Sequence, residues 1–340
     1  MLAFGEDPVA ALRARLEQDR QSLRFDKAYG YLPAILDALH IPVESQMAVF
    51  SKTSIQSLRI EPSNPRVLFF NDSVTVGWVR GGFIELAAQN PGGGIHFYAL
   101  RQRPDEPIRN REDCVNCHKS GTTQLRSATV APDGAPANAL DTDSRTPFDK
   151  LWGGWYVTGS SVPPVHKGNA VFDQQARREI KPVLYPKFSL ANSSDVVALM
   201  VFAHQMRMWN LLAHPDNINE LVDSLLFIDE PPLPGPIRGD SGFTENFSSA
   251  GPRDRAGRAL RQLDLDRRLM RYPCSYTIYS ETFDALPAET KAAIYQRMWT
   301  VLSGQDASTR YEKLSRADRR AVIEILRDTK KDLPAYFQVQ

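Results

Sequence analysis

The feature that most constrains this chain is the stretch REDCVNCHKS, residues 111–120, in which two of the three cysteines stand three residues apart. Cys114 and Cys117 are followed at once by His118, giving the spacing C-x-x-C-H. This is the spacing of covalent haem attachment, in which two thiols on one helical turn bond to the haem edge and the adjacent imidazole ligates the iron. We therefore expect the chain to fold around one covalently attached haem c, held by Cys114, Cys117 and His118.

Two other uses of a C-x-x-C pair fit the surrounding sequence less well. A structural zinc site needs two further Cys or His ligands at short spacing, but the third cysteine, Cys274, stands alone and far along the chain. A thioredoxin-like redox pair is preceded by a strand in a βαβ unit. Here a polar run with two prolines, residues 101–113, precedes the motif. The haem interpretation is favoured over both.

Composition excludes several classes of function. The 340 residues carry a formal net charge of +1, and no basic stripe indicates nucleic-acid binding. No uninterrupted apolar run approaches the roughly 18 residues of a membrane span. The first residues, MLAFGEDPVAALRARL, lack the pattern of a signal peptide. Because covalent haem is attached outside the bacterial cytoplasm, we expect that a signal was present in the precursor and that the protein is periplasmic or secreted.

The hydrophobic pattern predicts an α+β fold. Residues 8–41 show helical spacing, and residues 46–102 contain three alternating runs at 74–78, 84–88 and 95–99 separated by turn-forming residues. An antiparallel meander is the natural arrangement of such runs. We therefore expect an N-terminal helical segment over 1–45 and a β-meander with the haem-bearing region over 46–192.

The remaining segments are expected to be an irregular stretch and a helical half. Residues 103–192 are rich in Pro, Gly, Ser and Asp and show little periodicity, which suits a loop wrapped around a cofactor. A mainly helical region that packs on the haem region is expected over 193–340. Its helices are predicted at 194–213, 218–227, 255–270, 288–302 and 315–328, interrupted by a Pro/Gly/Ser-rich surface loop at 229–252.

The second axial position of the iron decides what such a protein can do. A strong ligand gives an electron carrier, whereas an open face gives a site for small molecules. His40, His96 and His214 are better explained as surface or helix-end residues. His204, on the apolar face of a predicted helix, and His166, in the loop VTGSSVPPVHKGNAVF, are the two histidine candidates. A methionine sulfur, with Met208 as the nearest alternative to His204, and an open position are the other possibilities.

Aromatic and basic residues near the motif are further candidates for the haem surroundings. Trp155, in LWGGWYVTG with Trp152 and Tyr156, could line the haem edge and donate to a propionate, or could simply be core. Arg126 is a candidate propionate partner, as are Arg111 and Lys119, although a solvated loop charge is the favoured interpretation of any one of them.

Five segments together resemble a family of exported bacterial proteins with one c-type haem motif. They are VFSKTSIQSLRIEPSNPRVLFFNDSVTVGWVRGG, CVNCHKSGTT, LWGGWYVTGSSVPPVHKGN, FAHQMRMWN and YPCSYTIYSETFDALP. The resemblance spans residues 46–330 and implies a secreted or periplasmic mono-haem protein. It also singles out the positions of His166 and His204. The corresponding family segment has the pattern THG…HMGN. Around His166 this chain has SSVPPVHKGN instead, so the loop departs from the pattern.

The leading expectation is electron transfer by haem iron, with a redox protein or a small oxidant or reductant as partner. A haem-c enzyme or small-ligand binder, such as a peroxidase-like oxidoreductase, is the alternative. This alternative is kept because a simple carrier needs only about 100 residues to bury one haem edge, whereas this chain has 340.

Overall fold

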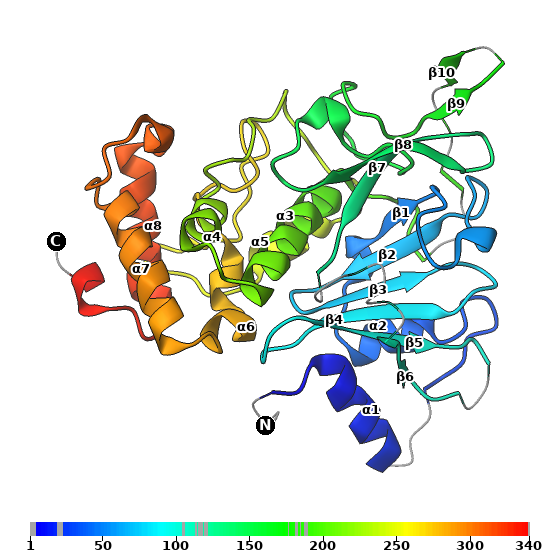
Figure 1. Cartoon of the computed structure of the whole chain (residues 1–340), viewed down its shortest axis with the longest axis horizontal. Coiled ribbons are helices and arrows are strands. Elements are labelled where there is room, and N and C mark those ends of the chain that lie inside the picture. The colour runs from blue at the N-terminus through cyan, green and yellow to red at the C-terminus, as the bar shows by residue number, and fades with distance from the viewer. Residues whose placement is uncertain are drawn as a thin grey trace.

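The computed structural model describes residues 5–18, 23–103, 106–112, 114, 118, 122–175, 177–180, 183, 185–186 and 190–338. Cys117 and Lys119 lie outside the described residues, so their predicted roles have no structural counterpart here. Within the described part the fold is α+β, as predicted: a six-stranded antiparallel sheet is followed by a mostly helical C-terminal half. Figure 1 shows the sheet at one end of the molecule and the C-terminal helices at the other.

The sheet is a simple meander in which each strand pairs with the next along the chain. The predicted runs at 74–78, 84–88 and 95–99 are confirmed as its three central strands. Two strands precede them and a short one follows, giving β1 Met47–Val49, β2 Arg66–Phe70, β3 Val74–Trp78, β4 Ile84–Gln89, β5 Ile95–Leu100 and β6 Arg109–Asn110. Turns built on Asn71, Gly81 and the glycines at 92–94 connect the central strands.

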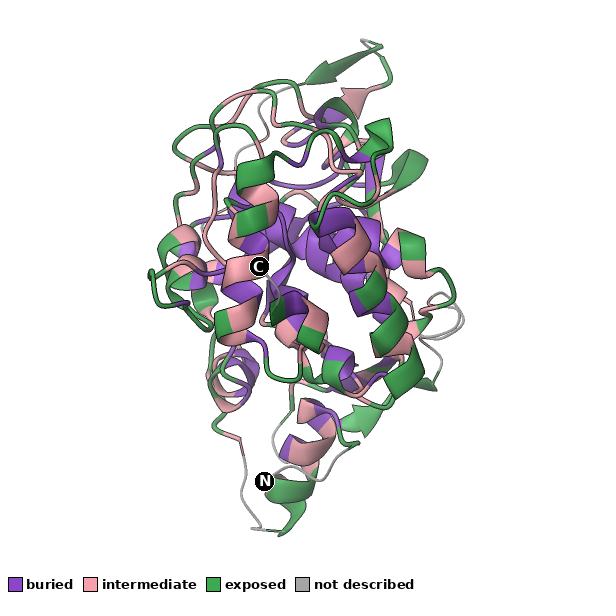
Figure 2. Cartoon of the chain, turned by 90° about the vertical axis from the view of Figure 1, so that its left-hand side faces the viewer, coloured by how far each residue is buried: buried purple, intermediate pink, exposed green. Residues whose placement is uncertain are grey.

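The two faces of the sheet pack against different partners. One face, with Val76, Leu86 and Leu100, packs with the N-terminal helices α1 Pro8–Gln18 and α2 Leu32–Ala38. The opposite face, with Leu68 and Phe70, packs with the C-terminal half. Figure 2 shows the buried segments gathered at the centre of the molecule, behind the exposed faces of the outer helices. The sheet is therefore the middle layer between two groups of helices.

The C-terminal half is built around one buried helix, α3 Val196–Ala213. The other helices of this half are α4 Ile218–Leu225, α5 Phe243–Ser249, α6 Glu281–Asp284, α7 Ala288–Leu302 and α8 Arg316–Thr329. Phe202 of α3 packs on Phe70 of β2 with ring centroids 4.9 Å apart. Trp209 of the same helix donates to the carbonyl of Asp72 at 3.1 Å, so α3 lies along the end of the sheet where β2 turns into β3.

Two predictions of secondary structure are corrected. Residues 255–270 form turns rather than a helix, because Asp254 accepts from the backbone of Ala256 and Arg258 and Gly257 adopts φ 77°. The stretch 103–192, predicted as irregular, contains two antiparallel hairpins: β7 Leu125–Val130 with β8 Pro136–Thr142, and β9 Val171–Asp173 with β10 Arg178–Ile180. Strand β8 is exposed along nearly all its length, so it has no alternating apolar face to reveal it.

The start of α3 is fixed by a buried carboxylate. Asp195 is the N-cap of α3, and its Oδ1 accepts from the backbone of Val197 and Ala198. Its Oδ2 accepts from the backbone N–H groups of Asp240 and Ser241 and from the Ser241 hydroxyl. The Pro/Gly/Ser-rich segment 229–252 is thereby attached to the helix that carries several of the predicted site residues.

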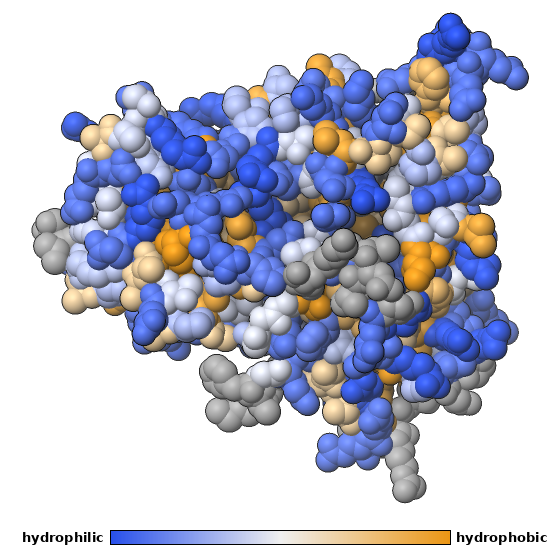
Figure 3. Space-filling view, viewed as in Figure 1, coloured by the Kyte–Doolittle hydropathy of each residue, from blue (hydrophilic) through white to orange (hydrophobic). Residues whose placement is uncertain are grey.

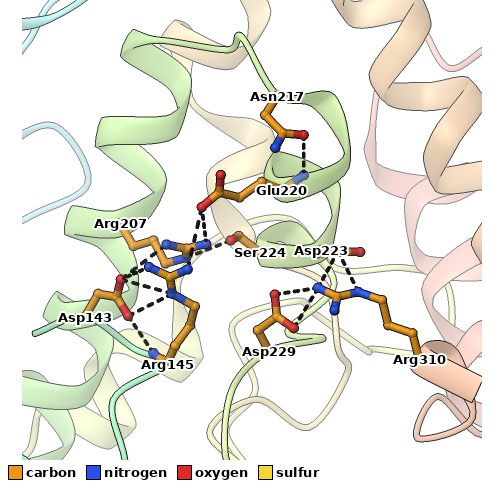
Figure 4. A network of polar contacts seen from close by, with 9 residues as sticks. All are labelled: Asp143, Arg145, Arg207, Asn217, Glu220, Asp223, Ser224, Asp229 and Arg310. Atoms are coloured by element: carbon orange, nitrogen blue, oxygen red, sulfur yellow. Dashed lines mark hydrogen bonds and ion pairs between the residues drawn. The ribbon is translucent and has the colours of Figure 1, made fainter.

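A network of ion pairs ties the β7–β8 hairpin to the helices (Figure 4). Arg207 of α3 is only 6% exposed and binds Asp143 at 3.2 Å, Glu220 at 3.1 Å and Ser224 at 2.8 Å. Arg145 joins the same two carboxylates from the chain just after β8. A buried guanidinium needs such complete pairing, because an unpaired buried charge is strongly unfavourable. The role of these ion pairs is therefore to neutralise the buried Arg207 and to stabilise the fold.

Among the described residues, one helix is long and apolar enough to cross a membrane by length and composition alone. It is α3, and 78% of that stretch is buried inside the protein. A buried core helix of a globular protein meets the same criterion, so no clear transmembrane segment emerges. The surface in Figure 3 is mostly hydrophilic, with separate apolar spots.

Candidate functional site

The two described residues of the motif lie on one helical turn. The backbone N–H of His118 donates to the carbonyl of Cys114 at 2.9 Å, which is the i to i−4 bond of an α-helix. The turn follows β6, and Arg111 just before it donates from its backbone to the carbonyl of Phe97 in β5. This bond joins the first and last residues of the motif, Cys114 and His118.

The imidazole of His118 is held in the tautomer of a metal ligand. Its Nδ1 lies 3.0 Å from the carbonyl oxygen of Thr122. A carbonyl oxygen only accepts, so Nδ1 carries the proton and Nε2 keeps its lone pair. Burial lowers the pKa of His118 below its ordinary value, which keeps the ring neutral near pH 7. Histidines that ligate metals are typically oriented by such a bond from the other ring nitrogen.

The site lies between β5 and α3. His118 stacks on Phe97 of β5 with ring centroids 4.8 Å apart. Just after the motif, Asn210 of α3 accepts from the backbone N–H of Thr123 and donates to its carbonyl, both at 2.7 Å. The Thr123 hydroxyl also donates to the sulfur of Met206 at 3.3 Å. The last part of α3 thus fixes the segment that orients His118.

The methionine next to this segment is not the one that the sequence suggested. Met206 and Asn210 are four residues apart, so they share one side of α3. Met208 lies about 200° around the helix from Met206 at about 100° per residue. Both residues are buried. The structure therefore brings Met206, and not Met208, to the segment that follows the motif.

His204 is corrected from a predicted iron ligand to a core residue. It is fully buried, its Nδ1 lies 2.7 Å from Glu230 Oε1, and its Nε2 lies 2.8 Å from Ser275 Oγ. Its ring also stacks on Phe227, with centroids 4.2 Å apart. Both nitrogens already have partners. The residue also lies about 200° around α3 from Met206, so it faces away from the motif.

The series Ser275, His204, Glu230 has the connectivity of an acyl-transfer triad, but it is not an accessible site. Ser275 is fully buried, and its hydroxyl also accepts from the backbone N–H of Thr277 at 3.3 Å. A nucleophile must reach the carbonyl that it attacks. These three residues therefore act as a hydrogen-bonded part of the core.

The tautomer of His166 does not suit ligation through Nε2. Its Nδ1 accepts from the backbone N–H of Gly168 at 3.0 Å, which in a neutral ring puts the proton on Nε2. The ring packs edge-on against Trp152 at 5.6 Å and Phe148 at 6.3 Å between centroids. The structure thus does not bring His166 into the arrangement predicted for a metal ligand.

Two further predicted cofactor contacts have other partners. The indole N–H of Trp155 donates to the carbonyl of Arg126 at 2.7 Å, so it is not available to a propionate. Arg126 pairs with Asp141 across the β7–β8 hairpin at 2.9 Å and is 48% exposed. Both residues thus stabilise this hairpin.

The structure gives structural or surface roles, as expected from the sequence, to Cys274, His40, His214 and His96. Cys274 is fully buried, and burial raises the pKa of its thiol to about 12. His40 follows α2 with φ 53°, His214 caps α3, and the exposed His96 binds Asp7 at 2.8 Å. None of these described contacts places them beside His118.

Sequence reasoning missed three residues that shape the site: Thr122, Phe97 and Asn210. Thr122 acts through its backbone carbonyl, which any residue type could supply. Phe97 belongs to a recognised strand, but the sequence cannot tell which loop covers it. Asn210 is the one with a usable signal, because it ends the segment FAHQMRMWN on a predicted helix, about 120° around the axis from His204.

Among the described residues, no group of three or more His, Cys, Asp or Glu side chains is arranged to hold a metal ion. Comparison with known family models, with curated proteins and with solved structures finds no match. A function can therefore be argued only from the site itself.

Proposed function

We propose that the protein is an exported mono-haem c-type protein whose iron transfers electrons. The observation that supports this most directly is the pair of bonds on one helical turn, His118 N–H to Cys114 carbonyl and His118 Nδ1 to Thr122 carbonyl. Together they bring the Cys114 thiol and a neutral imidazole with a free lone pair onto the same turn. This donor set fits haem iron and a haem vinyl group.

The haem would be held by Cys114 and Cys117 through thioether bonds and by His118 through Nε2, and it would supply one-electron chemistry at iron. The chain's own contribution is orientation. Thr122 fixes the His118 tautomer, and Phe97 supports the ring. Asn210 holds the backbone of the next residue, Thr123. We further propose that Met206 would supply a second ligand to the iron, because its sulfur accepts from the Thr123 hydroxyl, one residue after the carbonyl that orients His118.

Location and partner follow from the chemistry of attachment. Covalent haem is added outside the bacterial cytoplasm, so the protein would work in the periplasm or outside the cell. A His/Met pair of axial ligands gives an electron carrier, since the iron then needs no ligand exchange. Its partner would be a redox protein or a small-molecule oxidant or reductant.

The test is to produce the chain behind a periplasmic export signal in a bacterium that assembles c-type cytochromes. A pyridine haemochrome spectrum and metal analysis then identify the cofactor. We expect one haem per chain, retained after acid–acetone extraction, and no stoichiometric zinc. Haem that extracts completely, or zinc in its place, would overturn the proposal.

The spectrum of the same sample tests the role. A low-spin, six-coordinate spectrum in both oxidation states is expected of the carrier. A high-spin iron that binds carbon monoxide and reacts quickly with peroxide would instead favour the haem-c enzyme. The two functions thus differ in one measurement on the unmodified protein.

A further inference from the structure

We infer that the face of the sheet that carries Arg66 and Gln89 forms one wall of the haem pocket, with Arg66 as the cation that binds a haem propionate. We call this surface the sheet wall and define it by Arg66, Thr75, Glu85, Ala87 and Gln89. The inference rests on the proposed haem, and the experiment below separates the two.

The sheet wall is incompletely covered although it belongs to inner strands. Ile84, Leu86 and Ala88 of β4 are buried on the other face, whereas Glu85 and Ala87 are only half-buried. Ala87 pairs with Phe97, the residue on which His118 stacks, and Phe97 is also half-buried. An inner strand packed on both faces is normally buried throughout. The incomplete cover thus lies beside the imidazole.

Three polar atoms on this wall lack partners. They are Arg66 Nε, Thr75 Oγ1 and Gln89 Nε2, each buried and without a hydrogen bond among the described residues. Thr75 is 9% exposed and Gln89 is 4% exposed. A buried polar group without a partner is unfavourable, and native proteins contain few of them. Three on one surface indicate a polar ligand that completes it.

Arg66 is positioned by a glycine on the neighbouring strand. A β-carbon at Gly77 would lie 2.8 Å from Arg66 Nη2, so a larger residue there would displace the guanidinium from its present position. Arg66 Nη2 pairs with Glu85, which leaves its Nε–H as an unused donor in the buried part of the wall. A guanidinium can bind two carboxylates at once. A propionate would therefore add to the existing ion pair without breaking it.

The charges of this wall reach His118. Arg66 and Glu85 both act electrostatically on its imidazole, as does the more exposed Arg126. Arg126, by contrast, lies on the outer hairpin, is 48% exposed, and is already paired with Asp141. Arg66 is 22% exposed, so its charge is screened less by solvent. Of these two arginines, Arg66 has the free buried donor.

The test measures the reduction potential of haem-loaded Arg66→Gln and its dependence on pH. Loss of a nearby cation favours the oxidised iron, so the potential should fall. We expect at least a tenfold change in the oxidised-to-reduced ratio at fixed poise, about 59 mV for one electron. A propionate without its cation should also titrate at higher pH, adding a pH-dependent potential between about pH 5 and 8. Arg126→Gln is the matched control and should change neither property.

The outcomes separate the two proposals. Covalent attachment through Cys114 and Cys117 does not depend on Arg66, so Arg66→Gln should still carry one haem per chain. If the parent carries no haem, the proposed function fails. If it carries haem and Arg66→Gln matches Arg126→Gln, only the inference about the sheet wall fails. Should Arg66→Gln not fold, Arg66→Lys keeps the charge and loses the Nε donor, so its potential should stay near that of the parent while its pH dependence increases; an unchanged pH profile would overturn the role of Nε.

Discussion

The Nδ1 of His118 lies 3.0 Å from the carbonyl oxygen of Thr122, whereas the Nδ1 of His166 lies 3.0 Å from the backbone N–H of Gly168. The two histidines therefore have opposite tautomers. One backbone carbonyl makes His118 ready to bind a metal through Nε2. One backbone amide makes His166 a hydrogen-bond donor at the same atom.

This contrast predicts different results for the two histidines. His118→Ala should lose the low-spin spectrum, because iron loses its proximal nitrogen, while His166→Ala should keep it. Absorption spectra of the oxidised and reduced proteins measure both. A change of spin state in His166→Ala alone would show that the loop around it rearranges to bind iron.

The two methionines of α3 form a second matched pair. Met206→Leu should convert the iron to a high-spin or water-bound form that takes up carbon monoxide rapidly, because the proposed sulfur ligand is gone. Met208→Leu should leave the spectrum unchanged, because its side chain points to another side of the helix. Both changes conserve volume and should cost less than about 1.5 kcal/mol of stability. Identical spectra in both variants would exclude Met206 as the ligand.

Counting thiols tests the covalent attachment independently of any spectrum. The chain has three cysteines, and the pKa of Cys274 is raised to about 12 by burial, so it should not react at pH 8 in the native protein. After denaturation, alkylation and mass analysis should find one free thiol in the haem-loaded protein, at Cys274. Three free thiols would mean that Cys114 and Cys117 are not in thioether bonds.

His204→Ala should lower stability without changing the haem. Removing the ring leaves a cavity and two unpaired polar groups, Ser275 and Glu230, so we expect a loss of about 2–4 kcal/mol. Chemical denaturation gives the free energy of unfolding, and the spectrum of the folded fraction serves as the internal control. If His204→Ala instead changed the haem spectrum and left the free energy of unfolding unaltered, His204 would again be a candidate ligand.

Asp195→Ala should be among the most destabilising single changes in the chain. Its carboxylate caps α3 and accepts from two backbone groups and one hydroxyl of segment 240–241, so we expect a loss of about 3 kcal/mol or more. Ser315→Ala removes the exposed cap of α8, where Ser315 accepts from Asp318 N–H, and should cost only about 1 kcal/mol. Thermal unfolding compares the two. Equal losses would mean that segment 240–241 does not depend on Asp195.

The elements that the sequence predicted well are those with local signals. The central strands alternate apolar and polar residues between turn formers, and α3 begins at a capping aspartate, so both could be located from neighbours a few residues apart. The failures have local causes too. Strand β8 has no buried face, and the periodicity at 255–270 is broken by an Asp–Gly turn that a helical pattern does not reveal.

The sequence by itself determined the α+β class, the meander and the position of a C-x-x-C-H turn, because each depends on spacing within a short segment. The haem, the export and the electron transfer remain predictions from that spacing. Only the tertiary structure decided which partner each histidine nitrogen meets. His118, His166 and His204 are the same residue type, and what separates them is a carbonyl, an amide, or a carboxylate with a hydroxyl. These partners come from backbone groups and distant segments, and so residue type and spacing do not encode them.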